Sequence, residues 1–120
     1  MRYMLLIYDE ETKLDKMSEP DRRAMHQQYY DFIADIRAKG ALLAGDPLQR
    51  TSTATTVRAK NGKTITTDGP FAETKEQLGG YFIVEAKNLD EAIAMAARIP
   101  SVRGGGSVEV RPIMEIDLPK

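Results

Sequence analysis

The sequence predicts an α+β fold in which four strands and two helices follow one another as βαββαβ, with one additional β-hairpin. Three observations predict it. Two segments carry apolar residues at helical spacing behind a capping residue, at Ser18 and at Asn88. Short runs rich in apolar or β-branched residues flank these segments. Between two of these runs stands the pair Asn61-Gly62, which is typical of a tight hairpin turn.

The first strand is predicted over Tyr3–Tyr8, and its apolar residues on both faces indicate a central place in a sheet. The first helix is predicted to begin after Ser18 and to end at Gly40, because glycine readily adopts the left-handed conformation that closes a helix. Its apolar stripe is expected to pack in the core and not to bind a cofactor; the stripe consists of Met25, Tyr29, Phe32, Ile33 and Ile36.

The middle of the chain is predicted to hold a short strand and a hairpin. The apolar run Ala41–Ala44 is closed by the Gly-Asp-Pro turn signal at 45–47. The hairpin strands are expected at 54–60 and 63–67, joined by a type I′ turn. Their outward positions are Thr, Lys and Arg, so one face is expected to be solvated. Such a ribbon can cover a cleft or pair with another subunit.

Residues 68–80 break all periodicity, and an apolar strand follows over Tyr81–Glu85. The second helix is predicted to begin with a capping box formed by Asn88 and Glu91. It is expected to end by Ile99, because a proline disfavours helical geometry in the residue before it. A glycine-rich loop and a last strand over 108–114 complete the chain. The inward-facing residues of this helix are expected to be Leu89, Ile93 and Ala96 or Ala97.

This element order is that of a ferredoxin-like fold, in which both helices pack on one face of an antiparallel sheet. The strands YMLLIY, YFIVEA and VEVRPIM carry apolar residues on both sides, so the other face must also be covered. A second copy of the chain is the simplest cover. The sequence therefore predicts a two-fold homodimer packed sheet to sheet.

Composition excludes several classes of function. The chain has 120 residues, which predicts one domain over residues 1–120. It has no cysteine and one histidine, so thiolate chemistry is excluded, no metal site is expected, and no cofactor fingerprint is present. The net charge of −1 gives no attraction to nucleic acid. No run resembles a signal peptide or a membrane span, so a cytoplasmic location is expected and a membrane partner is not.

The segment from residue 68 to residue 80 is the candidate for chemistry. Asp68 cannot cap the residue two positions on, because Pro70 has no N–H. Its carboxylate either reaches the N–H of Phe71 or faces a cleft as a general base. From the residues alone a surface turn is favoured over a catalytic site. His26, on the border of the helical stripe, either enters a pocket or makes an ordinary boundary hydrogen bond.

The runs DGPFAETKEQLGGYF and LDEAIAMAARIPSVRGGGSVEVRPI, with the first strand, resemble the DGPF subgroup of the YCII-related family over nearly the whole chain. The resemblance implies a dimeric α+β barrel. It also implies a His and Asp pair in the founding type, whose positions here hold Tyr29 and Ile99, so that pair is not carried over. The expected replacement is catalytic Asp68 and His26, with Phe71, Glu73, Lys75 and Tyr30 as substrate-binding residues.

Three functions remain open at this point. One is a small-molecule-binding protein or cofactor-free enzyme whose cleft is lined by the 68–80 loop. The second, implied by the resemblance, is a regulatory or sensing module associated with an extracytoplasmic-function sigma factor. In the third, the loop only determines the fold: Phe71 fills the core, and Glu73 or Lys75 pairs across the dimer.

Overall fold

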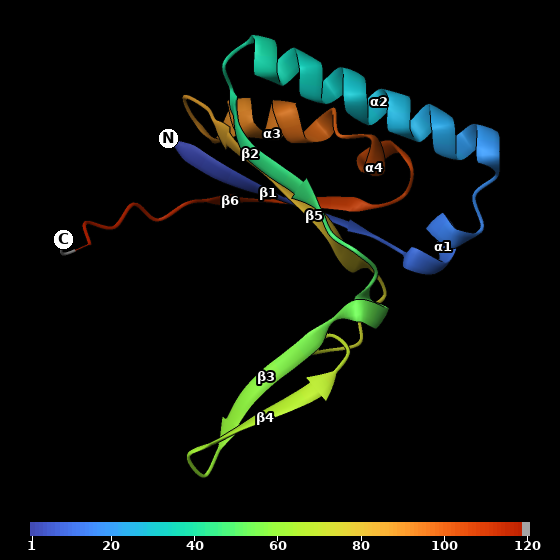
Figure 1. The fold of residues 1–120 in the computed structure, drawn as a ribbon. Coiled ribbons are helices and arrows are strands. Elements are labelled where there is room, and N and C mark those ends of the chain that lie inside the picture. Colours follow the sequence, from blue (N-terminus) through green and yellow to red (C-terminus); the bar gives the residue numbers. More distant parts are fainter. Residues whose placement is uncertain (119–120) are drawn as a thin grey trace.

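The structure is a computed structural model that describes residues 1–118, and it has the predicted ferredoxin-like arrangement (Figure 1). The four-stranded antiparallel sheet has the order β2-β5-β1-β6. The two central strands are β5 and β1, so the central place predicted for the first strand is confirmed. The bounds of the sheet strands are β1 Arg2–Asp9, β2 Leu42–Pro47, β5 Gln77–Glu85 and β6 Ser107–Pro112.

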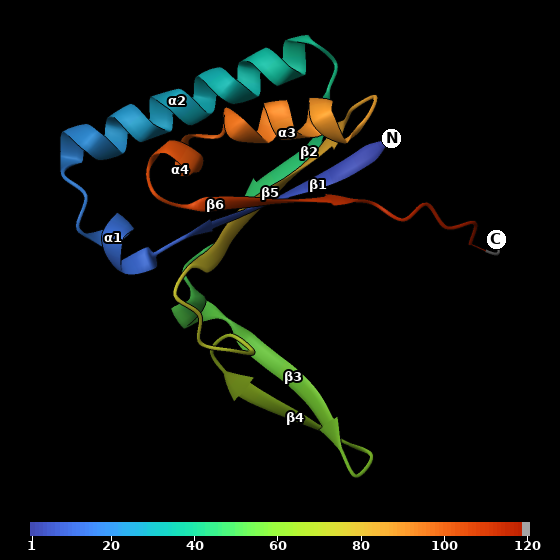
Figure 2. The same cartoon turned by 180° about the vertical axis from the view of Figure 1, so that it is seen from behind.

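The helices α2, α3 and α4 lie on one side of this sheet, and α1 lies beyond the end of β1 (Figures 1 and 2). Ser18 caps the long helix by accepting a hydrogen bond from the Asp21 N–H, and Asn88 caps the third helix in the same way from Glu91. Both predicted caps are thus confirmed. The helices are α1 Glu11–Asp15, α2 Glu19–Ala38, α3 Leu89–Ala97 and α4 Pro100–Arg103.

The core lies between these helices and the sheet. Tyr3, Leu5 and Ile7 of β1 point into it, and Phe32 and Ile36 of α2 meet them as the helical stripe predicts. The rings of Phe32 and Phe82 pack edge to face with centroids 5.5 Å apart. The core is completed by Val84, Ala86, Ala92, Met95, Ala96 and Ile99.

The inward face predicted for the second helix was wrong at two positions. Leu89 and Ile93 are about half exposed, and the buried residues are Ala92, Met95 and Ala96. Ala92 and Ala96 stand on the face toward the sheet, where small side chains allow a close approach, and Leu89 and Ile93 are left on the outer side. Leu89 and Ile93 therefore do not mark the buried face of this helix.

Several element boundaries also differ from the predictions. The second strand continues from Leu42 through the turn signal to Pro47, because residues 44–47 pair with β5. The segment after β1, expected to be irregular, contains α1. Pro100 does not only end a helix: it also begins the short helix α4. The last strand ends at Pro112, two residues earlier than predicted.

The hairpin of β3 (Thr55–Lys60) and β4 (Lys63–Asp68) follows the 3-10 turn η1 (Thr51–Thr53) and forms a separate two-stranded sheet. Asn61 and Gly62 both have positive φ, at 53° and 77°, as a type I′ turn requires. The hairpin projects away from the helices, on the side of the sheet that no helix covers (Figures 1 and 2). It lines no wall of the core.

Candidate functional site

A cleft of about 530 Å³ opens between α2 and the ends of β2 and β5. Most of its lining comes from α2, β5 and β2, and the end of β1 adds Ile7 and Asp9. The apolar lining residues are Ile7, Leu14, Met17, Met25, Ile33, Leu48 and Phe82. The polar lining residues are Asp9, Glu11, Arg22, His26, Asp46, Arg50 and Gln77, joined by Tyr29, Tyr30 and Tyr81. A largely apolar cavity with a few polar groups is the form that small-molecule sites usually take.

Asp9, the last residue of β1, places a carboxylate in the wall of this cleft. Burial raises the pKa of the Asp9 carboxyl above its usual range, and the nearby Glu76 adds to the rise. A hydrogen bond from Ser101 and the charge of Arg50 oppose it. The backbone of Gly106 lies directly against the Asp9 carboxylate, so closely that a side chain at position 106 would overlap it.

Asp9 is joined to Tyr29 through the buried hydroxyl of Ser101. The Ser101 Oγ donates to Asp9 Oδ2 at 2.7 Å and lies 2.6 Å from the Tyr29 hydroxyl oxygen. Since the serine proton goes to Asp9, the Tyr29 hydroxyl donates to Ser101. Burial raises the pKa of Tyr29, which keeps its proton in place. The result is an ordered chain of hydrogen bonds from a cleft tyrosine, through a buried serine, to a half-buried acid.

Other polar side chains that line the cleft form hydrogen bonds within the protein. Glu11 accepts hydrogen bonds from the Thr51 N–H at 2.9 Å and from the Thr51 hydroxyl at 2.6 Å, which fixes α1 to the start of η1. The Tyr81 hydroxyl donates to Asp46 at 2.8 Å, and this bond raises the pKa of Tyr81. These contacts give the rim a defined shape.

Comparison with known proteins supplies the family. The YCII-related domain matches residues 1–117. The chain belongs to the YCII-related family. A relative from Rhizobium meliloti (strain 1021), described as uncharacterised, is 37% identical over 119 residues, which cover 94% of this chain and 92% of the relative.

A solved structure shares the fold of this YCII-related protein. It is 5-chloro-2-hydroxyhydroquinone dehydrochlorinase from Burkholderia phenoliruptrix in complex with 2,5-dihydroxybenzoquinone. The similarity has a TM-score of 0.56 at 17% identity and covers 95% of this chain and 94% of that chain. At this identity the likeness shows a common fold.

The residues predicted from the sequence fall into two groups in the YCII-related structure. His26 and Tyr30 lie on α2 and line the cleft. Asp68 ends β4 and lies with the loop that follows it outside the residues lining the cleft of its own chain. The four loop residues are Asp68, Phe71, Glu73 and Lys75. Their catalytic and binding roles, and those of His26 and Tyr30, stay predictions.

One of the three functions left open by the sequence expected Phe71 to fill the core. In the structure Phe71 does not lie in the core of its own chain. Its side chain is 76% exposed. The loop instead folds back along the hairpin, because the Thr56 hydroxyl donates to the Gly69 carbonyl at 2.8 Å and Arg58 donates to the Phe71 carbonyl at 3.3 Å. The hairpin and the loop are therefore one structural unit.

Sequence reasoning missed Asp9, Ser101 and Tyr29 as a group. In the sequence, Asp9 is the first of three acids after an apolar run, Tyr29 belongs to the helical stripe and holds the position of the founding-type histidine, and Ser101 precedes a glycine-rich loop. The one usable signal is an acid directly after a buried strand. Its partners lie 20 and 92 positions away in the chain, and only the fold brings them together.

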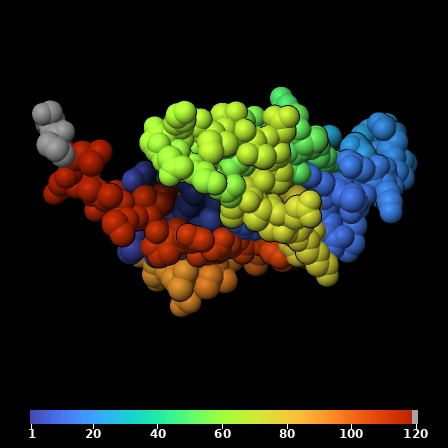
Figure 3. Space-filling view, turned by 90° about the horizontal axis from the view of Figure 1, so that it is seen from below, coloured from blue at the N-terminus to red at the C-terminus, as the bar shows by residue number. Residues whose placement is uncertain are grey.

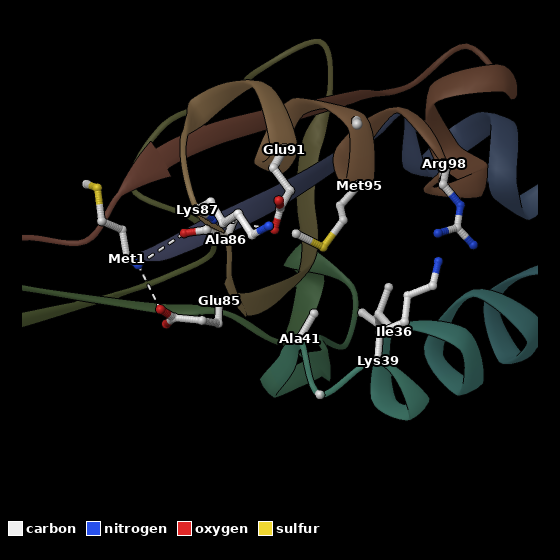
Figure 4. Close-up of a pocket in the computed structure, with 12 residues that line it drawn as sticks. Met1, Ile36, Lys39, Ala41, Glu85, Ala86, Lys87, Glu91, Met95 and Arg98 are labelled. Atoms are coloured by element: carbon white, nitrogen blue, oxygen red, sulfur yellow. Dashed lines mark hydrogen bonds and ion pairs between the residues drawn. The ribbon is translucent and has the colours of Figure 1, made fainter.

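A second hollow, of about 820 Å³, lies at the other end of α2, beside the start of α3 (Figure 4). Lys39 and Arg98 point into it, and both are paired with Asp35, at 3.1 Å and 2.6 Å. These two bonds hold the pKa of the Asp35 carboxyl below its usual range. The Arg98 pair joins α2 to the end of α3, and the Lys39 pair lies at the end of α2 itself, so these charged groups have a structural role.

Within residues 1–118, no cluster of three or more His, Asp or Glu side chains is placed to hold a metal ion. No helix in that part of the chain is long and apolar enough to cross a membrane.

Replacing Ser101 by Ala is expected to raise the pKa of Asp9 further, because the hydrogen bond that favours the ionised carboxylate is lost. It should also cost about 1–3 kcal/mol of unfolding free energy, since Asp9 and Tyr29 lose a buried partner. Carbon-13 NMR titration of the Asp9 carboxyl and urea unfolding measure the two effects. Ser52→Ala, at an exposed position of η1, is the control. An unchanged Asp9 pKa in Ser101→Ala would contradict the hydrogen-bond assignment.

Proposed function

We propose that this YCII-related protein is a small-molecule enzyme that uses general acid–base chemistry without a cofactor, and that Asp9 is its proton donor and acceptor. One observation carries the proposal: the chain of hydrogen bonds from Tyr29 through Ser101 to a cleft carboxyl of raised pKa. Acids with a raised pKa in a cavity are a common sign of a catalytic site.

The chain of hydrogen bonds can move a proton without moving a heavy atom. With Asp9 ionised, the Tyr29 oxygen presents lone pairs to the cleft because its own proton points to Ser101. A ligand hydroxyl that gives its proton to Tyr29 sends the tyrosine proton to Ser101 and the serine proton to Asp9. One proton leaves the ligand and one arrives at Asp9. The reverse transfer makes neutral Asp9 a general acid.

The lining of the cleft favours a small ring compound with oxygen substituents. Phe82, Tyr29 and Tyr30 offer aromatic surface, and Met25 and Ile33 add apolar contact. The oxygen substituents would meet Tyr29, Asp9 and His26. The ligand in the solved structure of similar fold, 2,5-dihydroxybenzoquinone, is of this class, which supports its use as a probe.

Binding of the probe tests the site. Titration of the labelled protein with 2,5-dihydroxybenzoquinone is expected to shift NMR signals of α2 and of residues 45–48 and 79–82. Tyr29→Phe should weaken binding about 2- to 10-fold, the effect of one hydrogen bond. Tyr3→Phe, a buried tyrosine outside the cleft, is the matched control. Signal shifts confined to residues away from the cleft, or equal affinities of both variants, would exclude the proposed site.

Assignment to the DGPF subgroup belongs to this proposal and rests on the motif at residues 68–71. The association with an extracytoplasmic-function sigma factor rests on the same resemblance alone. No contact within residues 1–118 favours it over the enzyme, so the regulatory module stays a prediction, as does the cytoplasmic location.

A further inference from the structure

Arg22, on the cleft side of α2, is a cation without an acidic partner. Its guanidinium is half-buried and donates a hydrogen bond from Nη2 to the Leu14 carbonyl of α1 at 3.1 Å. Within residues 1–118, no carboxylate oxygen lies within 4 Å of its nitrogens. The second arginine that lines the cleft, Arg50, is paired with Asp15 at 3.0 Å. Arg22 is therefore the cleft arginine whose charge can pair with a ligand.

The acidic side chains that line the cleft are held by other groups. The hydrogen-bonded pairs are Asp9 with Ser101, Glu11 with Thr51 and Asp46 with Tyr81. Bringing one of these carboxylates to Arg22 would break its present bonds. A half-buried guanidinium without a counter-ion carries a desolvation cost, which an anionic group can offset. Arg22 is thus suited to bind an anionic group of a ligand.

The hydrogen bond to Leu14 leaves two parallel donors on the Arg22 guanidinium. Nη2 carries two N–H groups, and Leu14 takes one of them. The other is parallel either to the Nε–H or to an Nη1 N–H, so one two-donor edge remains. Two parallel N–H donors match the two oxygens of a carboxylate. The bond to Leu14 also orients the side chain, so less conformational entropy is lost when an anion binds.

Arg22 lies about two helical turns before Tyr29, on the same face of α2. Seven residues of helix span about 10 Å. Figure 3 shows α1 and the first turns of α2 together at one end of the molecule, beside the residues that lead into the hairpin. The donors of Arg22 are thus at the α1 end of the cleft, and the hydroxyl of Tyr29 is further along α2.

We infer that the ring compound bound in this cleft carries a carboxylate on a short aliphatic chain, and that Arg22 selects it. The cleft of about 530 Å³ has room for such a chain beside one ring, since cavities of about 300–1,000 Å³ hold drug-sized ligands. Leu14 and Met25 offer apolar contact for the chain. The inference rests on the proposed function, because it takes the ring hydroxyl to meet Tyr29.

Calorimetric titration of the full chain with two matched probes tests the role of Arg22. The probes are p-hydroxyphenylpropanoate and its primary amide, which share ring and length and differ in charge. The unmodified protein is expected to bind the carboxylate about 10- to 100-fold more tightly than the amide, the effect of charged hydrogen bonds. Arg22→Gln should bind both probes with similar affinity. Arg22→Lys keeps the charge without the parallel donors, so it should retain only part of the preference.

Arg23→Gln is the matched control for these variants. Arg23 is the next residue of α2, but it is exposed and lies 3.9 Å from Glu19, outside the residues that line the cleft. This variant should keep the full preference for the carboxylate. Equal affinities of the two probes for the unmodified protein, or a preference that Arg22→Gln leaves intact, would overturn the inference. If Arg22→Gln fails to fold, an unchanged preference in Arg22→Lys overturns the two-donor contact.

Tyr29→Phe separates this inference from the proposed function. It should weaken the binding of both probes by the same factor, about 2- to 10-fold, and leave the ratio of their affinities unchanged. A ratio near one, with the effect of Tyr29→Phe present, would exclude the carboxylate and leave the proposed function standing. Equal affinities of Tyr29→Phe and the unmodified protein for both probes would exclude the proposed site of the ring hydroxyl, and the inference with it.

Discussion

Asp9→Asn is expected to lower the rate of proton transfer by about 10²- to 10⁴-fold, the usual contribution of a general acid or base. The reaction to follow is exchange of the ring hydrogens of 2,5-dihydroxybenzoquinone for deuterium in D₂O, monitored by proton NMR. Neutral Asp9 supplies a proton to a ring carbon through Ser101 and Tyr29, and the carboxylate then takes up a proton from the same carbon by the reverse route. Asparagine keeps the shape of the side chain and can do neither. Asp31→Asn, an exposed carboxylate on α2, should exchange like the unmodified protein.

The same substitution should not destabilise the protein at neutral pH. The pKa of Asp9 is raised in the folded state, so the folded state binds a proton more tightly than the unfolded chain does. This contribution to stability is complete below the unfolded pKa of about 4 and is lost as pH rises through the folded pKa. Above that range the buried charge is a cost, which Asn removes.

The melting temperature of Asp9→Asn is therefore expected to equal or exceed that of the unmodified protein at pH 7. The difference should shrink toward pH 4. Differential scanning calorimetry across this range measures it. A variant that loses exchange and is also less stable at pH 7 would indicate that Asp9 is a structural residue, and the catalytic assignment would fall.

Gly106→Ala is expected to displace Asp9 without replacing any ionisable residue. A methyl group at position 106 would overlap the Asp9 carboxylate and the Tyr8 carbonyl oxygen. The Gly106 N–H also donates a hydrogen bond to the Ser101 carbonyl of α4 at 2.8 Å. A shift of Gly106 would therefore strain this hydrogen bond. The expected cost is about 1–3 kcal/mol of unfolding free energy, the usual cost of overpacking.

Gly104→Ala is the matched control for this substitution. An added Cβ at position 104 would meet its nearest atom, the Pro100 carbonyl oxygen, at 3.6 Å, an ordinary contact, and its φ of −84° suits any residue. Urea unfolding gives the stability of both variants, and the exchange assay gives the effect on Asp9. We expect a loss in both measurements only for Gly106→Ala. Equal behaviour of the two variants would show that the space beside Asp9 is not tight.

Local sequence signals predicted the elements well where the signal and the cause are both local. Ser18 and Asn88 begin their helices because each accepts a hydrogen bond three residues on, and Asn61-Gly62 makes its turn because both residues tolerate positive φ. The inward face of α3 was mispredicted because it depends on how closely the helix approaches the sheet. Ala92 and Ala96 belong to the core cluster together with Val84, and Val110 packs against that cluster.

At the candidate site, local sequence signals predicted only part of the set of residues that the fold brings together. His26 and Tyr30 were selected from the sequence, and the structure places both at the cleft. Asp68 was selected because Pro70 denies it a local partner, which is a local reason and says nothing about distance to a cavity. Asp9 carried no comparable signal, because its pKa depends on burial by residues from other elements.

By itself, then, the sequence determined the ferredoxin-like order of elements, the caps and the hairpin turn, since each depends on neighbours within a few residues. It also excluded thiolate chemistry, because composition alone decides that. Only the tertiary structure decided that the end of β1, the middle of α2 and the start of α4 meet at one point. Burial and hydrogen bonding between Asp9, Ser101 and Tyr29 arise from that meeting, so no local pattern could contain them.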